Sequence, residues 1–184
     1  ATYTINVASG KFTDSVGNNN SASNTFSWTY DSTAPTITGV TLANNNTTIT
    51  VTFSEAVYTT NSGSGSLEVD DFVFALSGGD ATLSSTTPSS ISINGNEYTL
   101  GISLSGTPNG SEILTVNPVL NSIYDLVGNV ASTSQSNNSI SLNDKLGPTM
   151  TISSSTVNSG ETSNDSTISL TFTSSESTTN FIKD

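Results

Sequence analysis

Carboxylates placed just before tight turns recur along this chain of 184 residues. The segment 125–129, with the sequence DLVGN, repeats the segment 14–18, DSVGN, which lies 111 positions earlier. Each copy is followed by a strand-like run, then by an acidic residue and a proline, at 31–35 and again at 144–148. A long fixed period with matching turns indicates tandem domains. The chemistry open to these turns is the binding of hard cations by carboxylate and carbonyl oxygens.

The composition excludes several other kinds of site. There is no Cys and no His, which removes disulfides, the usual zinc ligand sets and both Ser-His-Asp and Cys-His catalysis. The net charge is −12, so the surface repels phosphate backbones and we expect no nucleic-acid partner. No apolar run is long enough to span a bilayer, and we expect no membrane insertion by this segment.

The elements that must position these acids are predicted to be β-strands. Apolar residues alternate with Ser, Thr and Asn, which is typical of strands with one buried face. The Asn94-Gly95 pair is a strong signal for a hairpin. About seven or eight strands in roughly 110 residues are typical of an immunoglobulin-like sandwich. The clearest runs lie at 3–7, 26–30, 49–53, 69–76, 98–104, 113–116 and 140–142.

We therefore predict an all-β chain of tandem immunoglobulin-like β-sandwich domains, one complete and two partial. Residues 1–31 are expected to be the last strands of a preceding domain, 32–147 a complete domain, and 148–184 the first strands of a following domain. Because residue 1 begins inside a strand-like pattern, we expect the sequence to be an internal piece of a longer chain.

This topology predicts that acids distant in sequence meet at the junction between the first two domains. The second strand of the complete domain returns to the pole where the chain comes in, so Glu55 lies near Asp31 in the linker. The third strand begins at that pole and adds Asp70 or Asp71, and the turn that holds Asp125 lies there too. Several carboxylates within a few Å need a counter-charge, and Ca²⁺ suits such a flexible oxygen site better than Mg²⁺. The alternative is that Asp, Gly and Asn occur in these turns only because they favour turn conformations, and that no cation binds there.

The same logic predicts a second calcium site at the next junction, from Asp144, Glu176 and Asp184. In the third domain Glu176 follows a strand as Glu55 does in the second. The segment 159–165 in this domain is unusually long and polar.

The order of these motifs resembles the bacterial Ig-like domains of giant repeat adhesins and biofilm-associated surface proteins. The residues that carry the resemblance are the linker 31–35 (Asp-x-x-x-Pro), the segment 54–57 (Ser-Glu-Ala-Val), 70–72 (Asp-Asp-Phe) and the turn 125–129. The resemblance implies an extracellular or cell-surface location and calcium between domains. It implies calcium ligation by Asp31, Glu55, Asp71, Asp125 and Asn129.

We expect the protein to be a structural repeat module of a long extracellular surface protein, an adhesin stalk or fibre, stiffened by calcium at its domain junctions. Its partners would be neighbouring Ig-like domains of the same chain or filament, with lateral self-assembly between chains. The alternative is a glycan- or surface-binding module, with an aromatic residue such as Trp28 as a platform for sugar stacking. Paired carboxylates can also hydrolyse glycosides. Here they are expected beside turn glycines, not along an aromatic cleft, so we expect no enzyme activity.

Overall fold

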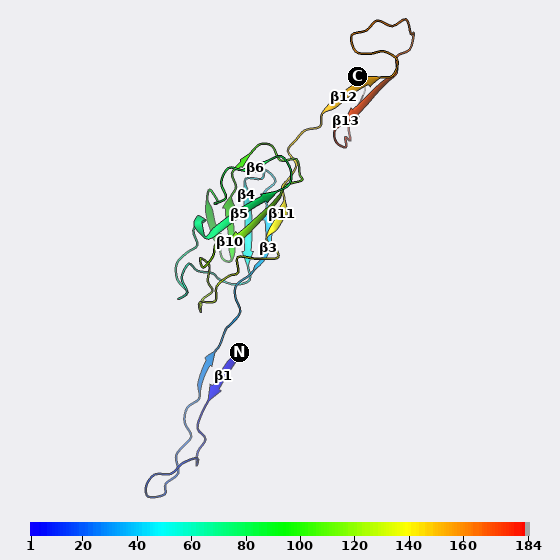
Figure 1. Cartoon of the computed structure of the whole chain (residues 1–184). Coiled ribbons are helices and arrows are strands. Elements are labelled where there is room, and N and C mark those ends of the chain that lie inside the picture. Colours follow the sequence, from blue (N-terminus) through cyan, green and yellow to red (C-terminus); the bar gives the residue numbers. More distant parts are fainter. Residues whose placement is uncertain (183–184) are drawn as a thin grey trace.

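The computed structural model describes residues 1–182, in which there are β-strands, one short 3-10 helix and no α-helix. This confirms the prediction of an all-β chain. An N-terminal hairpin, a central domain and a C-terminal hairpin follow one another along the molecule (Figure 1). The buried apolar side chains of the described residues all lie between Pro35 and Leu142, in or next to the central domain.

Two antiparallel sheets form most of the central domain, in a sandwich-like arrangement. The four-stranded sheet has the order β3-β4-β8-β7, and the three-stranded sheet has the order β11-β10-β5. A small two-stranded sheet pairs β6 with β9. The strands are β3 (Ile37–Leu42), β4 (Thr48–Phe53), β5 (Phe72–Ser77), β6 (Thr82–Leu83), β7 (Ile91–Asn94), β8 (Glu97–Gly101), β9 (Leu104–Ser105), β10 (Ile113–Pro118) and β11 (Ser139–Ser141).

Alternation along the strands builds the core, as the sequence predicts. In β4, Ile49, Val51 and Phe53 are at most 2% exposed, while the threonines between them are only half-buried. In β10, on the other sheet, Leu114 and Val116 are fully buried. Since successive side chains of a strand point to opposite faces, each strand gives one face to the core.

Aromatic rings join the two sheets near the pole that faces the N-terminal hairpin, which we call the junction pole. Phe53 at the end of β4 meets Tyr98 of β8 edge to face, with ring centroids 5.6 Å apart. Phe72 at the start of β5 lies 6.3 Å from Phe53 and 6.1 Å from Tyr98. All three residues are at most 3% exposed. This cluster fixes the strand ends from which the candidate site is built.

The structure differs from the predicted strands in two places. The run 98–104 is not one strand, because β8 ends at Gly101, which pairs with Thr48 at the start of β4. The chain then moves to β9 in the small sheet. The run that begins at Val69 starts as a 3-10 turn, η1 (Val69–Asp71), before β5. Asp71 stabilises this turn, because its carboxylate accepts the backbone N–H of Glu68 at 2.7 Å.

Buried polar side chains tie loops together at the opposite pole. The fully buried Glu112 accepts backbone N–H groups from Asp80, Ala81, Asn109 and Gly110, at 3.0–3.2 Å. Burial alone would raise the pKa of Glu112, but these hydrogen bonds outweigh it and the pKa is lowered. The backbone N–H groups therefore favour the ionised form of this buried carboxylate.

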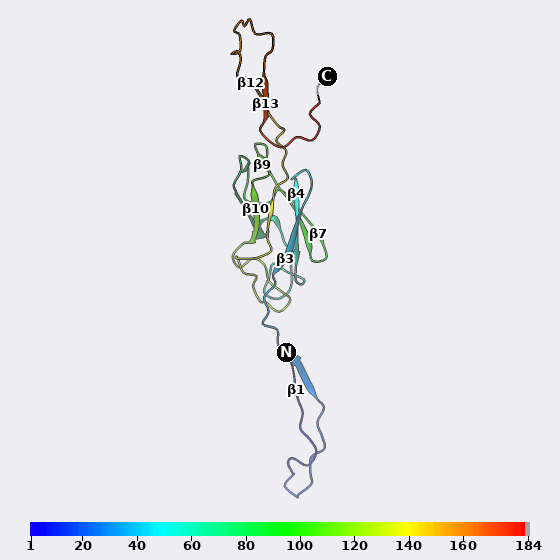
Figure 2. The same ribbon diagram turned by 90° about the vertical axis from the view of Figure 1, so that its right-hand side faces the viewer.

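The two terminal hairpins extend from opposite ends of the central domain (Figures 1 and 2). The N-terminal hairpin pairs β1 (Thr2–Ile5) with β2 (Phe26–Thr29), and the C-terminal hairpin pairs β12 (Met150–Ser154) with β13 (Leu170–Ser174). Their strand residues are almost all exposed. The molecule is therefore elongated, with a packed centre and two uncovered ends.

Candidate cation site at the first junction

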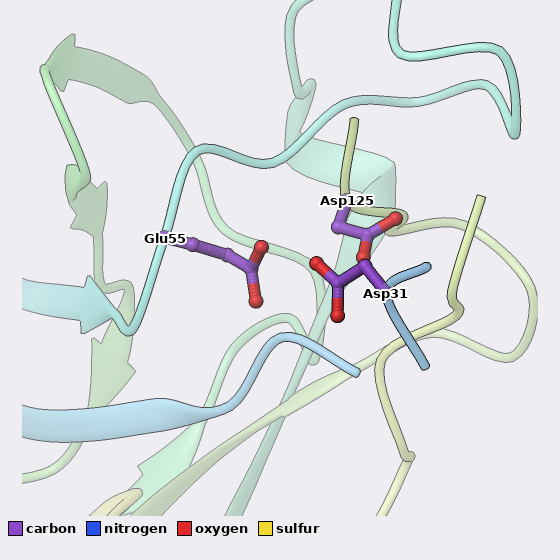
Figure 3. Close-up of side chains that lie close together, drawn as sticks. All are labelled: Asp31, Glu55 and Asp125. Atoms are coloured by element: carbon purple, nitrogen blue, oxygen red, sulfur yellow. The ribbon is translucent and has the colours of Figure 1, made fainter. Parts of the chain in front are cut away.

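Three carboxylates meet where the N-terminal hairpin joins the central domain. Asp31 lies in the linker after β2, Glu55 follows β4, and Asp125 lies in the turn after β10. One carboxylate oxygen from each lies within 4.8 Å of the others (Figure 3). The predicted convergence of these three acids is therefore present in the structure, while metal binding by them stays a prediction.

A pair of backbone hydrogen bonds brings Glu55 and Asp125 together. Tyr58, just after Glu55, and Tyr124, just before Asp125, exchange N–H···O bonds of 2.7 and 2.8 Å. Tyr124 also forms a bridge with Val130, which closes the turn. The loop after β4 is thus fixed against the turn after β10 by main-chain pairing.

The turn itself holds Asp125 in one orientation. One carboxylate oxygen of Asp125 accepts the backbone N–H groups of Val127 and Asn129, at 2.9 and 2.8 Å. Gly128 has a φ of +96°, and an added Cβ would lie 2.6 Å from the carbonyl oxygen of Asn61. The position therefore requires glycine, both for its φ and for the close approach of the neighbouring loop.

Asn129 fastens the linker to this turn. Its side-chain amide donates to the other carboxylate oxygen of Asp125 at 2.7 Å, and to the backbone oxygens of Asp31 and Thr33 at 3.3 Å. The resemblance implied that Asn129 is a calcium ligand. The structure shows its amide as a hydrogen-bond donor that joins the linker to the central domain, and ligation of calcium by its side-chain oxygen stays a prediction.

The electrostatics of the three acids are unequal. Burial of the nearly inaccessible Asp125 would by itself raise its pKa, but hydrogen bonds from Asn129, Val127 and Gly128 lower it. The pKa of Glu55 is raised, first by desolvation and then by repulsion from Asp125 and Asp31. Ionisation is therefore disfavoured at Glu55 and favoured at Asp125.

The lysines whose positions are described do not relieve this repulsion. Lys11 lies in the loop of the N-terminal hairpin, where its backbone N–H bonds to Asn20. Lys145 lies beside Asn45 and Asn46, at the β3–β4 turn and so at the other end of β4 from Glu55. A hard cation with oxygen ligands is the counter-charge that this arrangement suits best.

Asp70 and Asp71 do not belong to the group of three. Asp71 is used as the cap of η1, where its carboxylate accepts from Glu68. Desolvation raises the pKa of Asp71, as do Glu68 and Asp70, while the hydrogen bond from Glu68 lowers it. The sequence did not predict this 3-10 turn, in which the Asp71 carboxylate is engaged with Glu68. Metal ligation by Asp70 or Asp71 stays a prediction.

At the second junction, Asp144 and Glu176 occupy positions like those of Asp31 and Glu55 at the first. The carboxylate of Asp144 accepts the N–H of Leu146 at 2.8 Å, as that of Asp31 accepts the N–H of Thr33 at 3.0 Å. Glu176 follows β13 as Glu55 follows β4. The third predicted member, Asp184, lies outside the described residues.

The N-terminal hairpin contains a counterpart of the turn that holds Asp125. Asp14 accepts the N–H groups of Val16 and Asn18 and the side-chain amide of Asn18, at 2.8–3.0 Å, in the same pattern as Asp125. These hydrogen bonds lower the pKa of Asp14. Repetition of the turn in sequence thus corresponds to repetition of its hydrogen bonds.

Gln135 is a residue of this junction that the sequence did not reveal. Its side-chain oxygen accepts the backbone N–H of Ile37 at 2.8 Å, which satisfies the first residue of β3 as the chain comes in from the linker. Its own amide donates to Ser132 at 2.8 Å. No sequence motif marks this role, because it depends on a contact between positions 98 residues apart.

No protein-family model, curated protein or solved structure matches this chain. Among the described residues there is also no helix of the length and apolar character that a membrane crossing requires.

Proposed function

We propose that this chain is a structural repeat module of a long extracellular surface protein, built from immunoglobulin-like domains whose junctions are stiffened by Ca²⁺. The observation that carries the proposal is the meeting of Asp31 from the linker with Glu55 and Asp125 from the central domain. A cation held by these three groups bonds the linker to the domain, so binding and stiffness are coupled.

The form of the molecule supports this role. Hairpins continue the central domain at both ends (Figure 2), and the repeated turn around Asp14 provides the same carboxylate geometry one period earlier. Stability and stiffness in such arrays depend on the contacts between nearest neighbours. The proposed partners are neighbouring Ig-like domains of the same chain or filament, with lateral self-assembly between chains.

Calorimetric titration with CaCl₂ tests the metal part of the proposal. We expect saturable binding with a dissociation constant of about 10⁻⁴–10⁻³ M, the range of extracellular calcium modules. Asp125→Asn and Glu55→Gln should each abolish the binding at this junction, because each removes one of three charged ligands.

Asp14→Asn is the matched control for Asp125→Asn, since it alters the same kind of turn away from the other two acids. Thermal melting in chelator shows whether each variant has kept its fold. Absence of binding heat at millimolar calcium in the unaltered chain would refute the site.

A further inference from the structure

The sequence contains two Asn-Gly dipeptides, Asn94-Gly95 and Asn109-Gly110. Asparagine followed by glycine is especially open to deamidation, because glycine has no side chain to hinder attack by its backbone nitrogen on the asparagine amide. Both dipeptides belong to the central domain, but their surroundings differ. The same chemistry can therefore be compared at two places in one fold.

The first dipeptide closes the β7–β8 hairpin. Asn94 is the last residue of β7 and pairs with Glu97, so Gly95 and Asn96 form a two-residue loop. Gly95 has a φ of +60°, and an added Cβ would meet no other atom within 4 Å. Because β7 is the outer strand of the four-stranded sheet (Figure 2), the dipeptide lies at an exposed edge.

The reacting groups of this dipeptide are not engaged elsewhere. Within residues 1–182, neither the side-chain amide of Asn94 nor the backbone N–H of Gly95 makes a hydrogen bond. For the attack, Asn94 has to leave the extended conformation of β7, which opens only the last pair of an edge strand. Local openings of this kind cost much less free energy than global unfolding.

The second dipeptide is held by hydrogen bonds at both of its reacting groups. The side-chain amide of Asn109 donates to Asp80 at 3.0 Å, and its side-chain oxygen accepts the N–H of Ser111 at 3.0 Å. The backbone N–H of Gly110 donates to the carboxylate of Glu112 at 3.1 Å. The amide carbon of Asn109 therefore cannot approach the nitrogen of Gly110 until these bonds break.

Glu112 also protects Gly110 through its charge. A backbone nitrogen attacks only after it has lost its proton, and a carboxylate beside it disfavours the negative charge that then forms. The hydrogen bonds that Glu112 accepts favour its ionised form, and the residue is fully buried. The protection therefore lasts as long as the surrounding loops stay folded.

We propose that Asn94 is a site of spontaneous deamidation in the folded protein, and that Asn109 is protected from the same reaction. The nitrogen of Gly95 forms a bond to Cγ of Asn94, the bond from Cγ to Nδ2 breaks, and the proton from Gly95 leaves with the amide group as ammonia. Water then opens the resulting succinimide ring at one of its two carbonyls. The products are aspartate and isoaspartate, and water is the co-reactant.

Either product changes the edge of the sheet. A carboxylate at position 94 lies opposite Glu97, and like charges directly opposite each other destabilise a pair of strands. Isoaspartate also adds a carbon atom to the main chain of the hairpin in which Asn96 accepts the N–H of Phe53 at 3.0 Å. Since Phe53 belongs to the aromatic cluster of the junction pole, the modification is made next to this cluster.

Timed incubation of the full chain at pH 8, followed by cleavage after glutamate, tests the proposal. Cleavage after Glu68, Glu97 and Glu112 gives the peptides 69–97 and 98–112, so each dipeptide lies in a peptide of its own. Mass spectrometry measures the replacement of NH₂ by OH and locates it, and an isoaspartyl methyltransferase detects isoaspartate. Asn94 should react at least about ten times faster than Asn109, the factor that one hydrogen bond to a charged group supplies.

Two controls separate the effect of the fold from that of the dipeptide. Asn94→Gln should leave position 94 unmodified, because the longer side chain closes its ring far more slowly. In urea, where the fold is lost, Asn94 and Asn109 should react at similar rates. The proposal would be overturned by an unreactive Asn94 in the folded chain, by equal rates at the two positions there, or by a difference that persists unchanged in urea.

Discussion

Two buried carboxylates, Asp125 and Glu112, show how individual residues keep a negative charge inside this protein. Each is at most 1% exposed, and each is surrounded by backbone N–H donors. Hydrogen bonds to an ionised group are stronger than those between neutral groups. Asp125 also lies beside the carboxylates of Asp31 and Glu55, so it contributes to a candidate cation site as well as to local structure.

Glu112→Gln should destabilise the central domain by about 2–4 kcal/mol at pH 7, because it replaces a charged acceptor with an amide facing several N–H donors. The folded pKa of Glu112 is lowered, so its stabilising contribution is present above the unfolded pKa and is lost as pH falls toward the folded value. Denaturant unfolding at pH 7 and at pH 3 measures both effects.

Glu97→Gln, at an exposed position on β8, is the control and should change little. An equal loss of stability for Glu112→Gln at both pH values would show that the charge of Glu112 does not stabilise the fold.

Glu55→Gln should change the stability of the fold in the opposite direction to Glu112→Gln when no calcium is present. The folded pKa of Glu55 is raised by desolvation, Asp125 and Asp31, so its ionised form costs stability above that pKa, and the cost disappears as pH falls through it. We expect the variant to be more stable than the unaltered chain at pH 7 in chelator, by about 0.5 kcal/mol.

With calcium added, this order should reverse, because the unaltered chain gains binding energy that the variant has lost. Thermal melting with and without calcium measures both comparisons. A variant that is less stable in chelator would mean that Glu55 is not repelled by its two neighbours.

At the scale of elements, alternation was the signal that made the strands predictable. The runs around Ile49 and Leu114 became β4 and β10 with the expected inward faces. The end of β8 at Gly101 was not predictable, because it depends on where the partner strand β4 begins. Alternation describes one strand at a time, whereas strand length is set by the pair.

The candidate site was also predictable only in part. Asp31, Glu55 and Asp125 follow from topology, since they lie in the linker, at a strand end and in a repeated turn. The 3-10 turn in which Asp71 caps Glu68 was not predictable, because a three-residue helical turn leaves no periodic pattern in the sequence. The hydrogen bonds from the amide of Asn129 to the linker were not predictable either, since no motif describes a contact with the linker backbone.

At the scale of the whole molecule, the proposed function depends on how firmly the N-terminal hairpin is fixed to the central domain. The hydrogen bonds that join Asp31 and Thr33 of the linker to the central domain come from the amide of Asn129, which donates to their two carbonyls at 3.3 Å. These are long, exposed hydrogen bonds, so the linker should bend readily without a cation. Calcium on Asp31, Glu55 and Asp125 would add ionic bonds across the same joint.

A distance distribution between two spin labels tests this claim most directly. The chain has no cysteine, so Ser15→Cys in the N-terminal hairpin and Ser92→Cys on β7 can be labelled uniquely, and dilution with unlabelled protein removes distances between copies. We predict a broad distribution in chelator that narrows when calcium is added, and no narrowing when Asp31→Asn is also present. Asp165→Asn, in the exposed loop before β13, should leave the narrowing intact. A distribution of the same width with and without calcium would contradict the account.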